Sequence, residues 1–381
     1  MPSVADALRQ HAPAYLKRFG DAVPTGHLKV ISAITRCRTG ALGGVLYHCD
    51  GCGREHWVGR SCGNRHCPSC GKEKLYAWLD KQTQRLMPVH HFLVTFTVPT
   101  ELRLVLRGHQ TDGYRALFDA AASSIRDVGS VTKSLAGCQL GYFGILHTWG
   151  RDPTVYHPHV HFVVPGGGVK VDDQGRAITW QATPENFLFD HGTLVRVYKA
   201  KLADQLRACG LYEQVPIKGW SKTFVVDIRP AGDGRAVLKY LAPYVHRVAI
   251  SDSRIAHCDK SLVMFLYKPS RAKTYRRRTV SGTEFVRGFL QQTLPPGFQK
   301  IRYYGWMSAN SKIPLEEVRW LIWLFLGWTF WLASGHAPQD KPPPRPQVRC
   351  ANCGSTMRVI QVTYEPVRLL TQHALSYLDS G

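Results

Sequence analysis

The alternation of apolar and polar positions predicts a sheet in the middle of the chain. Runs of apolar, β-branched and aromatic residues bounded by Gly or Pro are typical of strands. Four such runs are HHFLVTFTVP (residues 90–99), GYFGILHTWG (141–150), VYHPHVHFVVP (155–165) and KTFVVDIRP (222–230). A short loop with Gly and Pro joins the second run to the third, which favours an antiparallel pair. We interpret the PGGG that ends the third run as a turn.

Segments with helical spacing of apolar residues lie around these runs. We expect helices at about 3–20, 72–87, 115–128, 194–210 and 234–250. This mixture indicates an α+β fold in which helices pack on a central antiparallel sheet. The apolar run at 320–333 has 14 residues, which is too short to cross a bilayer comfortably. We therefore interpret it as a buried or docking helix and expect no membrane segment.

Composition adds a strong positive charge to this picture. The 381 residues include 49 Lys and Arg against 27 Asp and Glu, so the formal net charge is +22. A charge of this size attracts polyanions, and nucleic acid is the first partner to consider. The N-terminus has no apolar export signal, so we expect a cytoplasmic protein associated with the nucleoid.

Two cysteine pairs near the N-terminus predict a metal site. The chain has 11 cysteines, and close pairs in a reducing compartment indicate metal ligands and not disulfides. Cys49/Cys52 and Cys67/Cys70 are C-x2-C knuckles, and we expect these four residues to hold one structural Zn²⁺.

Other cysteines leave the number of metal ions open. Cys37, Cys62 and His66 lie near the knuckles and are candidates for a second zinc ion or for exchange into the first site. The pair Cys350/Cys353 has no second half, so it predicts no metal site unless a partner supplies ligands.

One face of the third run carries histidines. If this run is a strand, His157, His159 and His161 share a face, with apolar residues on the other. Imidazoles in a row are costly to bury neutral and unpaired, so metal ligation is the better explanation. His159 and His161 lie about 7 Å apart along the strand. We expect His147 of the neighbouring run as the third ligand, with His157 as its competitor. Such a site leaves positions for phosphate oxygens and water, as Lewis-acid catalysis requires.

The sequence LKYLAPYVHR contains the best candidates for a protein nucleophile. Tyr240 and Tyr244 are four residues apart, which places them on one helical face. The plainer interpretation is that both tyrosines pack the helix onto the sheet. Pro243 removes a helical hydrogen bond and predicts a kink between them, so their shared face is not assured by the spacing.

A basic stretch with interleaved tyrosines, YKPSRAKTYRRR, suits phosphate neutralisation with base stacking. A solvated basic loop is the alternative. The candidate DNA-binding residues are Lys268, Arg271, Lys273, Arg276, Arg277 and Arg278.

These motifs resemble the rolling-circle transposases of the bacterial insertion-sequence ninety-one type. HPHVHFVVPGG resembles their His-hydrophobic-His (HUH) motif and YLAPYVHR their two-tyrosine motif. CRTGALGG, SCGNRHCPSC, LHTWG, EFVRGFLQQTLPPGF and IRYYGW are also similar, so the resemblance covers about residues 10–310.

The resemblance implies a metal-dependent endonuclease and strand transferase that acts on single-stranded DNA at transposon ends and targets. It assigns an Mg²⁺ or Mn²⁺ ion to His159 and His161, and nucleophilic attack to Tyr240 and Tyr244. The implied intermediate is a 5′-phosphotyrosine, which retains the energy of the ester, so no nucleotide cofactor is expected. A plasmid replication initiator or a relaxase would use the same chemistry, and a non-catalytic zinc DNA-binding protein would need no HUH metal.

We expect four consecutive regions. They are an N-terminal arm with the zinc module (1–87), an HUH catalytic domain (88–250), a basic DNA-contacting region (251–336) and a Pro-rich linker with a tail (337–381).

Overall fold

The computed structural model describes residues 2–246, 250–269, 272, 274–327 and 348–366, without the side chains of 72–74, 76, 243, 244 and 246. The chain forms two compact units, each built from separate stretches. The first comprises residues 1–74, 246–293 and 338–381, and the second comprises 75–245 and 294–337. The consecutive regions expected from the sequence do not coincide with these units, because the chain passes repeatedly from one unit to the other.

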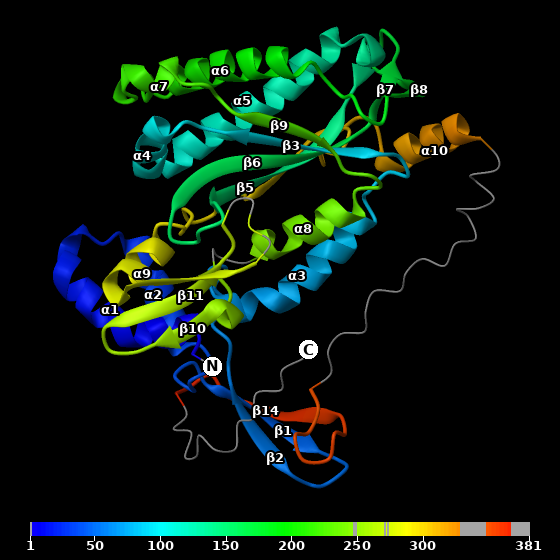
Figure 1. Ribbon diagram of the computed structural model, residues 1–381. Helices are drawn as coiled ribbons and strands as arrows, with labels where there is room; N and C mark the ends of the chain where they lie inside the picture. The colour runs from blue at the N-terminus through cyan, green and yellow to red at the C-terminus, as the bar shows by residue number, and fades with distance from the viewer. Residues whose placement is uncertain (1, 247–249, 270–271, 273, 328–347, 367–381) are drawn as a thin grey trace. The chain divides into compact units, whose positions relative to one another are not determined.

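The second unit is organised around a five-stranded antiparallel sheet in the order β13-β5-β6-β3-β9. The predicted α+β fold and the antiparallel pairing of β5 with β6 are confirmed, and the histidine strand β6 lies at the centre (Figure 1). The strands are β3 (His91–Thr97), β5 (Gly141–Trp149), β6 (Tyr156–Pro165), β9 (Val226–Pro230) and β13 (Ile301–Gly305).

Alternation along the strands gives this sheet two apolar faces. On one face, the fully buried ring of Phe162 meets Phe96 edge-to-face at 5.7 Å between centroids, and truncating such a ring to Ala costs about 3–5 kcal/mol. Helices cover this face: α4 (Thr100–Gly108), α5 (Gln110–Val131) and α6 (His191–Ala208). The short α7 (Ile217–Ser221) follows α6.

The opposite face of the sheet carries a second apolar cluster, which includes Ile145 of β5 and Val163 of β6. The helices that contribute to it are α8 (Arg235–His246), α10 (Leu315–Leu326) and the part of α3 (Pro68–Thr83) that belongs to this unit. Leu238 and Leu241 of α8 are fully buried. α8 is therefore anchored on the same face of the sheet as the odd-numbered residues of β6.

The glycines after β6 do not form the turn that the sequence predicts. Only Gly166 lies in a bend, and Gly167 and Gly168 already belong to β7 (Gly167–Val171). A Cβ atom on Gly167 would collide with the ring of Trp180, and one on Gly168 would lie 2.8 Å from the Cβ of Cys138. Glycine is needed there because β7 packs closely in a small sheet with β4 (Cys138–Gln139) and β8 (Ala177–Ala182).

The first unit contains two three-stranded sheets among its described residues, in the orders β14-β1-β2 and β10-β11-β12. Its helices are α1 (Val4–Phe19), α2 (Thr25–Arg36) and α9 (Gly282–Leu290), together with the first residues of α3. Its strands are β1 (Gly44–Cys49), β2 (Glu55–Gly59), β10 (Ile255–Cys258), β11 (Leu262–Tyr267), β12 (Arg276–Ser281) and β14 (Met357–Val362). A capping box of Ser3 and Asp6 starts α1.

The apolar run at 320–333 is only partly described. Its first residues belong to α10, and residues 328–333 lie outside the described part of the chain. Among the residues that the structure describes, none of the helices combines the length and the apolar character that crossing a bilayer needs.

The buried imidazole of His91 predicts acid sensitivity. Burial lowers the pKa of His91 to about 4 from 6.5, so the unfolded chain binds a proton more readily than the folded chain does. The folded state is therefore most stable above about pH 6.5, and the free energy of unfolding falls as the pH falls toward 4. Urea unfolding at pH 7 and at pH 5 measures this effect. Between these two pH values, the free energy of unfolding of His91→Leu should fall by roughly 2 kcal/mol less than that of the unchanged chain.

The control is Phe92→Leu, which changes a buried neighbour without a titrating group. It should lower the free energy of unfolding equally at both pH values. If His91→Leu retained the full acid dependence, His91 would not be a buried neutral imidazole.

Candidate functional site

Three histidines converge on one face of the central sheet. His147 of β5 lies directly opposite His159 of β6, and His161 follows two positions along β6. All three side chains are buried, and one ring nitrogen of each lies within 4.8 Å of the others. The structure thus brings together the three residues expected from the sequence. His157 is not part of this group, although its ring centroid is 5.0 Å from that of His159.

Hydrogen bonds orient two of the rings. Nδ1 of His159 donates to the carbonyl oxygen of His157 at 2.7 Å, which leaves Nε2 with the lone pair that binds a metal ion. Nδ1 of His161 lies 2.8 Å from the hydroxyl oxygen of Thr95, its neighbour on β3. The remaining nitrogen of His161 is again Nε2. Such partners fix the tautomer and direction of a metal-binding ring.

The electrostatic environment keeps these imidazoles uncharged. Burial lowers the pKa of His159 to about 4 and holds the pKa values of His147 and His161 well below their usual range. A neutral imidazole is the form that ligates a metal ion. Three buried neutral rings with their nitrogens directed together therefore fit a divalent cation, and protonation does not compete with it at pH 7.

Tyr240 of α8 is the tyrosine placed beside this cluster. Its ring centroid lies 6.3 Å from that of His161, in an edge-on arrangement, and its side chain is 51% exposed. α8 continues through Pro243 to His246, so the proline does not end the helix. The side chain of Tyr244 lies outside the described part of the structure.

Eight cysteines of the first unit form two clusters and not the quartet predicted from the sequence. The first cluster consists of Cys37, Cys62, Cys67 and Cys70, and the second of Cys49, Cys52, Cys350 and Cys353.

The predicted quartet combined one half of each cluster. It is wrong because two C-x2-C pairs separated by fourteen residues are also compatible with two different sites, each completed by more distant residues. Cys37 and Cys62 belong to the first cluster, as one of the sequence alternatives allowed. His66 is buried but is not a member of it.

The first cluster is closed by residues from the end of α2, a loop and the start of α3. The Sγ atom of Cys70 lies 3.6 Å from those of Cys37 and Cys62, and the Sγ atoms of Cys67 and Cys37 are 3.7 Å apart. A hydrogen bond with Cys62 lowers the pKa of Cys37 to about 7. Four thiolates at tetrahedral spacing are the donor set of a structural zinc site with no open position.

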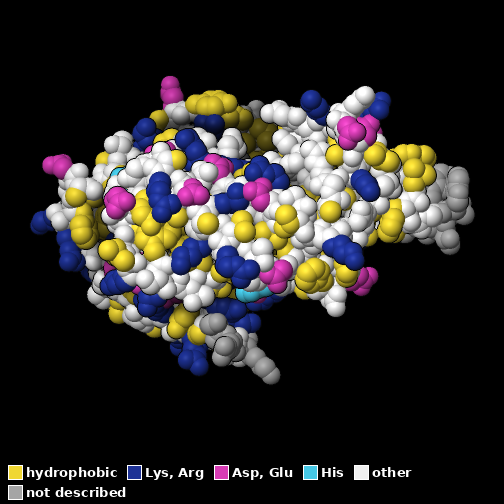
Figure 2. Space-filling view, turned by 90° about the horizontal axis from the view of Figure 1, so that it is seen from above, with side chains coloured by type: hydrophobic (Ala, Val, Ile, Leu, Met, Phe, Trp, Pro, Cys, Tyr) yellow, Lys and Arg dark blue, Asp and Glu magenta, His cyan; other side chains and the backbone are white. Residues whose placement is uncertain are grey.

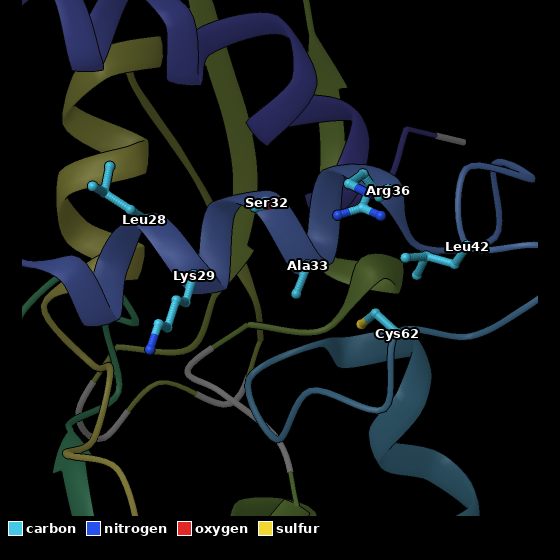
Figure 3. Close-up of a pocket in the computed structure, with 7 residues that line it drawn as sticks. All are labelled: Leu28, Lys29, Ser32, Ala33, Arg36, Leu42 and Cys62. Carbon is cyan, nitrogen blue, oxygen red and sulfur yellow. The ribbon is translucent and has the colours of Figure 1, made fainter. Parts of the chain in front are cut away.

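A pocket with two cationic side chains in its lining lies beside the first cluster. Figure 3 shows its lining from α2 together with Leu42 and the first-cluster residue Cys62. Lys29 and Arg36 supply the charge. These cations suit a phosphate backbone, which binds mainly through charge.

The basic stretch predicted to bind DNA is described in part. Lys268 is half-buried, Arg276 and Arg277 are exposed, and these two pair with Tyr267 and Leu266 on β11. Arg278 of the same strand is half-buried, and Arg271 and Lys273 lie outside the described residues.

The face of the molecule seen in Figure 2 carries charges of both signs, unlike the basic stretch. Lys and Arg side chains there are interspersed with Asp and Glu. Ion pairs on α5 and α6, such as Lys201 with Asp127 at 2.6 Å, show the same neutralisation.

Two sets of residues escaped the sequence analysis. Nothing in the sequence marked Thr95 as a partner of His161, because a threonine in a strand is common. The pairing of Cys350/Cys353 with Cys49/Cys52 had no distinguishing signal either, because CDGCG, CPSCG and CANCG all share their spacing and the glycine that follows.

Comparisons with known proteins agree along most of the chain. A family model described as "Transposase zinc-binding domain", of the IS91 type, matches residues 7–98, and one described as "Putative transposase" matches residues 141–313. "Putative transposase y4qJ" of Sinorhizobium fredii is 32% identical over 82% of this chain and 81% of its own length. "Transposase for insertion sequence element IS801" of Pseudomonas savastanoi pv. phaseolicola is 26% identical over 74% of this chain and 70% of its own. No solved structure matches.

The hydrogen bond between His161 and Thr95 predicts that removing the threonine hydroxyl weakens metal binding. Thr95→Val keeps the shape of the side chain but removes the partner of His161 Nδ1. Losing such an orienting partner typically weakens metal binding about 10- to 100-fold, and we expect this loss for Mn²⁺ titrated into the protein and followed by electron paramagnetic resonance. Zinc content should not change, because the thiolate clusters are separate.

The matched control is Thr97→Val, two residues along the same strand. The hydroxyl of Thr97 donates to the carbonyl oxygen of Val225 and not to the histidines, so its loss should leave Mn²⁺ affinity nearly unchanged. Equal effects of both substitutions would mean that Thr95 does not orient His161.

Proposed function

Because this chain belongs to the IS91 family of transposases with an N-terminal zinc-binding domain, we propose that it cleaves and rejoins single-stranded DNA through a 5′-phosphotyrosine intermediate in rolling-circle transposition. DNA is the partner that a transposase requires. Beyond DNA as the partner, we propose the preference for single strands, the covalent intermediate and the residues that form it.

The observation that carries the proposal is the position of Tyr240 beside the histidine cluster. A nucleophile must be reachable by a large substrate and close to the group that activates the phosphate. Tyr240 meets both conditions, since about half of its side chain is exposed and its ring lies 6.3 Å from His161. The fully buried Leu238 and Leu241 hold its helix in place.

The reaction exchanges one ester for another. The phenolic oxygen of Tyr240 forms a bond to the phosphorus of the scissile phosphodiester and gives up its proton to solvent. The bond from phosphorus to the 3′ oxygen breaks, and that oxygen takes up a proton to become a free 3′-hydroxyl. Attack by a 3′-hydroxyl on the phosphotyrosine reverses these steps and rejoins strands. No nucleotide cofactor is needed because the ester bond count is unchanged.

The histidine cluster would hold the divalent ion that this chemistry uses, Mg²⁺ or Mn²⁺. When bound by His147, His159 and His161, the ion would polarise the phosphate and stabilise the charge that develops on it. The three rings themselves stay neutral, and hydrogen bonds fix those of His159 and His161, so these two can donate lone pairs without reorganising.

A second tyrosine fits a reaction that handles two strands. We assign this role to Tyr244, one turn further along α8, on the ground of the two-tyrosine motif. The path of the DNA includes the basic strand β12 with Arg276, Arg277 and Arg278, together with Lys268, Arg271 and Lys273 of the same stretch.

Trapping the covalent adduct tests the mechanism. With single-stranded oligonucleotides from candidate transposon ends and Mg²⁺ or Mn²⁺, the protein should form an adduct that survives denaturing electrophoresis. At least one of Tyr240→Phe and Tyr244→Phe should still form it, the double variant should not, and each single variant should block transposition in cells. His159→Ala should abolish the adduct while zinc content and DNA binding are retained.

Tyr364→Phe is the control, since Tyr364 is an exposed tyrosine of the first unit and its loss should leave the adduct unchanged. Mass spectrometry of the trapped peptide identifies the linked residue. Cleavage that survives the double variant would indicate a metal-bound water as the nucleophile, and the tyrosine mechanism would be wrong. Folded protein that binds DNA and never forms an adduct would favour a DNA-binding protein without catalysis.

Salt dependence tests the proposed DNA path. Each phosphate contact on a single strand contributes about −0.7 to the slope of log affinity against log salt concentration. Changing Arg276, Arg277 and Arg278 together to Gln should therefore make the slope shallower by about 2 if all three contact phosphates. Fluorescence anisotropy with a labelled oligonucleotide measures it.

The control triple variant changes Arg126, Arg176 and Arg207 to Gln. All three arginines are exposed and paired with carboxylates in the second unit, so the same charge is removed from residues outside the basic stretch. A slope that changes equally in both triple variants would place the DNA path elsewhere.

A further inference from the structure

Two short knuckles from opposite ends of the sequence meet in the first unit. The Sγ atoms of Cys49 and Cys353 are 3.4 Å apart, and those of Cys52 and Cys350 are 3.6 Å apart. All four sulfur atoms lie within 4.8 Å of one another, and none of these cysteines forms a disulfide. The residues that the zinc-binding family model matches end at 98, so they contain only half of this cluster.

The two knuckles have the same backbone. In each, the residue after the second cysteine is a glycine with positive φ, +67° at Gly53 and +74° at Gly354. The N–H of that glycine donates to the carbonyl oxygen of the first cysteine, at 2.8 Å in both knuckles.

A further bond of the knuckles is also shared. The N–H of the first cysteine donates to the carbonyl oxygen five residues further on, from Cys49 to Arg54 at 2.9 Å and from Cys350 to Ser355 at 2.8 Å. Two loops of different sequence that adopt one conformation around facing sulfur atoms indicate a shared geometric requirement.

A histidine lies beside the four sulfur atoms. A ring nitrogen of His56 lies 3.5 Å from the Sγ atom of Cys350. Four cysteine sulfur atoms this close together are the donor set of a closed zinc site.

The apolar contacts around this sheet are few. The buried apolar cluster described there consists of Cys49, Cys350 and Met357, with three half-buried residues against it. Beyond Met357, every residue of β14 is exposed. A small sheet with so little apolar burial generally needs a disulfide or a metal ion to be stable.

We propose that Cys49, Cys52, Cys350 and Cys353 bind a second Zn²⁺, distinct from the ion of the first cluster, and that this ion fastens β14 near the C-terminus to the hairpin of β1 and β2. β14 then completes the sheet as the partner of β1, as drawn in Figure 1. The pair Cys350/Cys353, which had no second half in the sequence, finds it about 300 residues earlier.

Zinc stoichiometry of the full-length protein tests the proposal. Protein purified under reducing conditions should contain two zinc ions per chain by elemental analysis, and Cys350→Ser/Cys353→Ser should contain one. When Co²⁺ replaces zinc, the thiolate-to-metal absorption of this variant should fall by about half. Hydrogen exchange should accelerate at residues 357–362, which form β14, while α1 and α9 of the same unit remain protected.

Two further variants separate metal loss from misfolding. Cys353→His replaces the most exposed ligand by another zinc ligand and should retain two zinc ions. Cys138→Ser/Cys209→Ser removes two cysteines outside both clusters and should also retain two. One zinc ion in the unchanged protein, two in Cys350→Ser/Cys353→Ser, iron in place of zinc, or a disulfide among the four cysteines would each overturn the proposal.

Discussion

The candidate metal site of the second unit depends on three uncharged imidazoles that are buried on one face of its sheet. Alternation along β5 and β6 and the register that sets His147 opposite His159 bring the rings together. A slip of one residue would turn every histidine to the opposite face, which is packed with aromatic rings. The register of β3 against β6 is equally fixed, because it sets Thr95 beside His161. The apolar packing of the sheet therefore also determines the geometry of the proposed metal-binding group.

The same burial sets the protonation state of the three imidazoles. Removing the imidazoles from water lowers their pKa, so they stay available as ligands under conditions in which an exposed histidine is partly protonated. In the proposed reaction the tyrosine has the opposite requirement, because a DNA strand would have to reach it from solvent. Tyr240 satisfies it by standing on a helix whose other face is buried through Leu238 and Leu241.

The sequence predicted residue groups well where side chains of one chemical type follow the two-residue alternation of a strand. His159 and His161 share a face because strands alternate, and a histidine in the adjacent run was a natural third member, so this group was predictable. Thr95 was not, since its role depends on the register between β3 and β6, which a single strand pattern does not contain. The cysteine pairs were recognisable as ligands, but their grouping was predicted wrongly. Proximity in the sequence favoured Cys49/Cys52 with Cys67/Cys70, whereas the fold pairs each with residues that only tertiary structure brings near.

The pairing of β14 with β1 has a consequence for the order in which the protein is made. The hairpin of β1 and β2 leaves the ribosome about 300 residues before its third strand, which corresponds to roughly 15–60 s at ordinary rates of synthesis. Throughout this interval one edge of β1 has unpaired backbone groups, and an isolated two-stranded hairpin is marginally stable at best. The hairpin is thus made early, but the sheet to which it belongs is completed late. A chain that terminates before β14 would carry an open strand edge on β1, which favours aggregation.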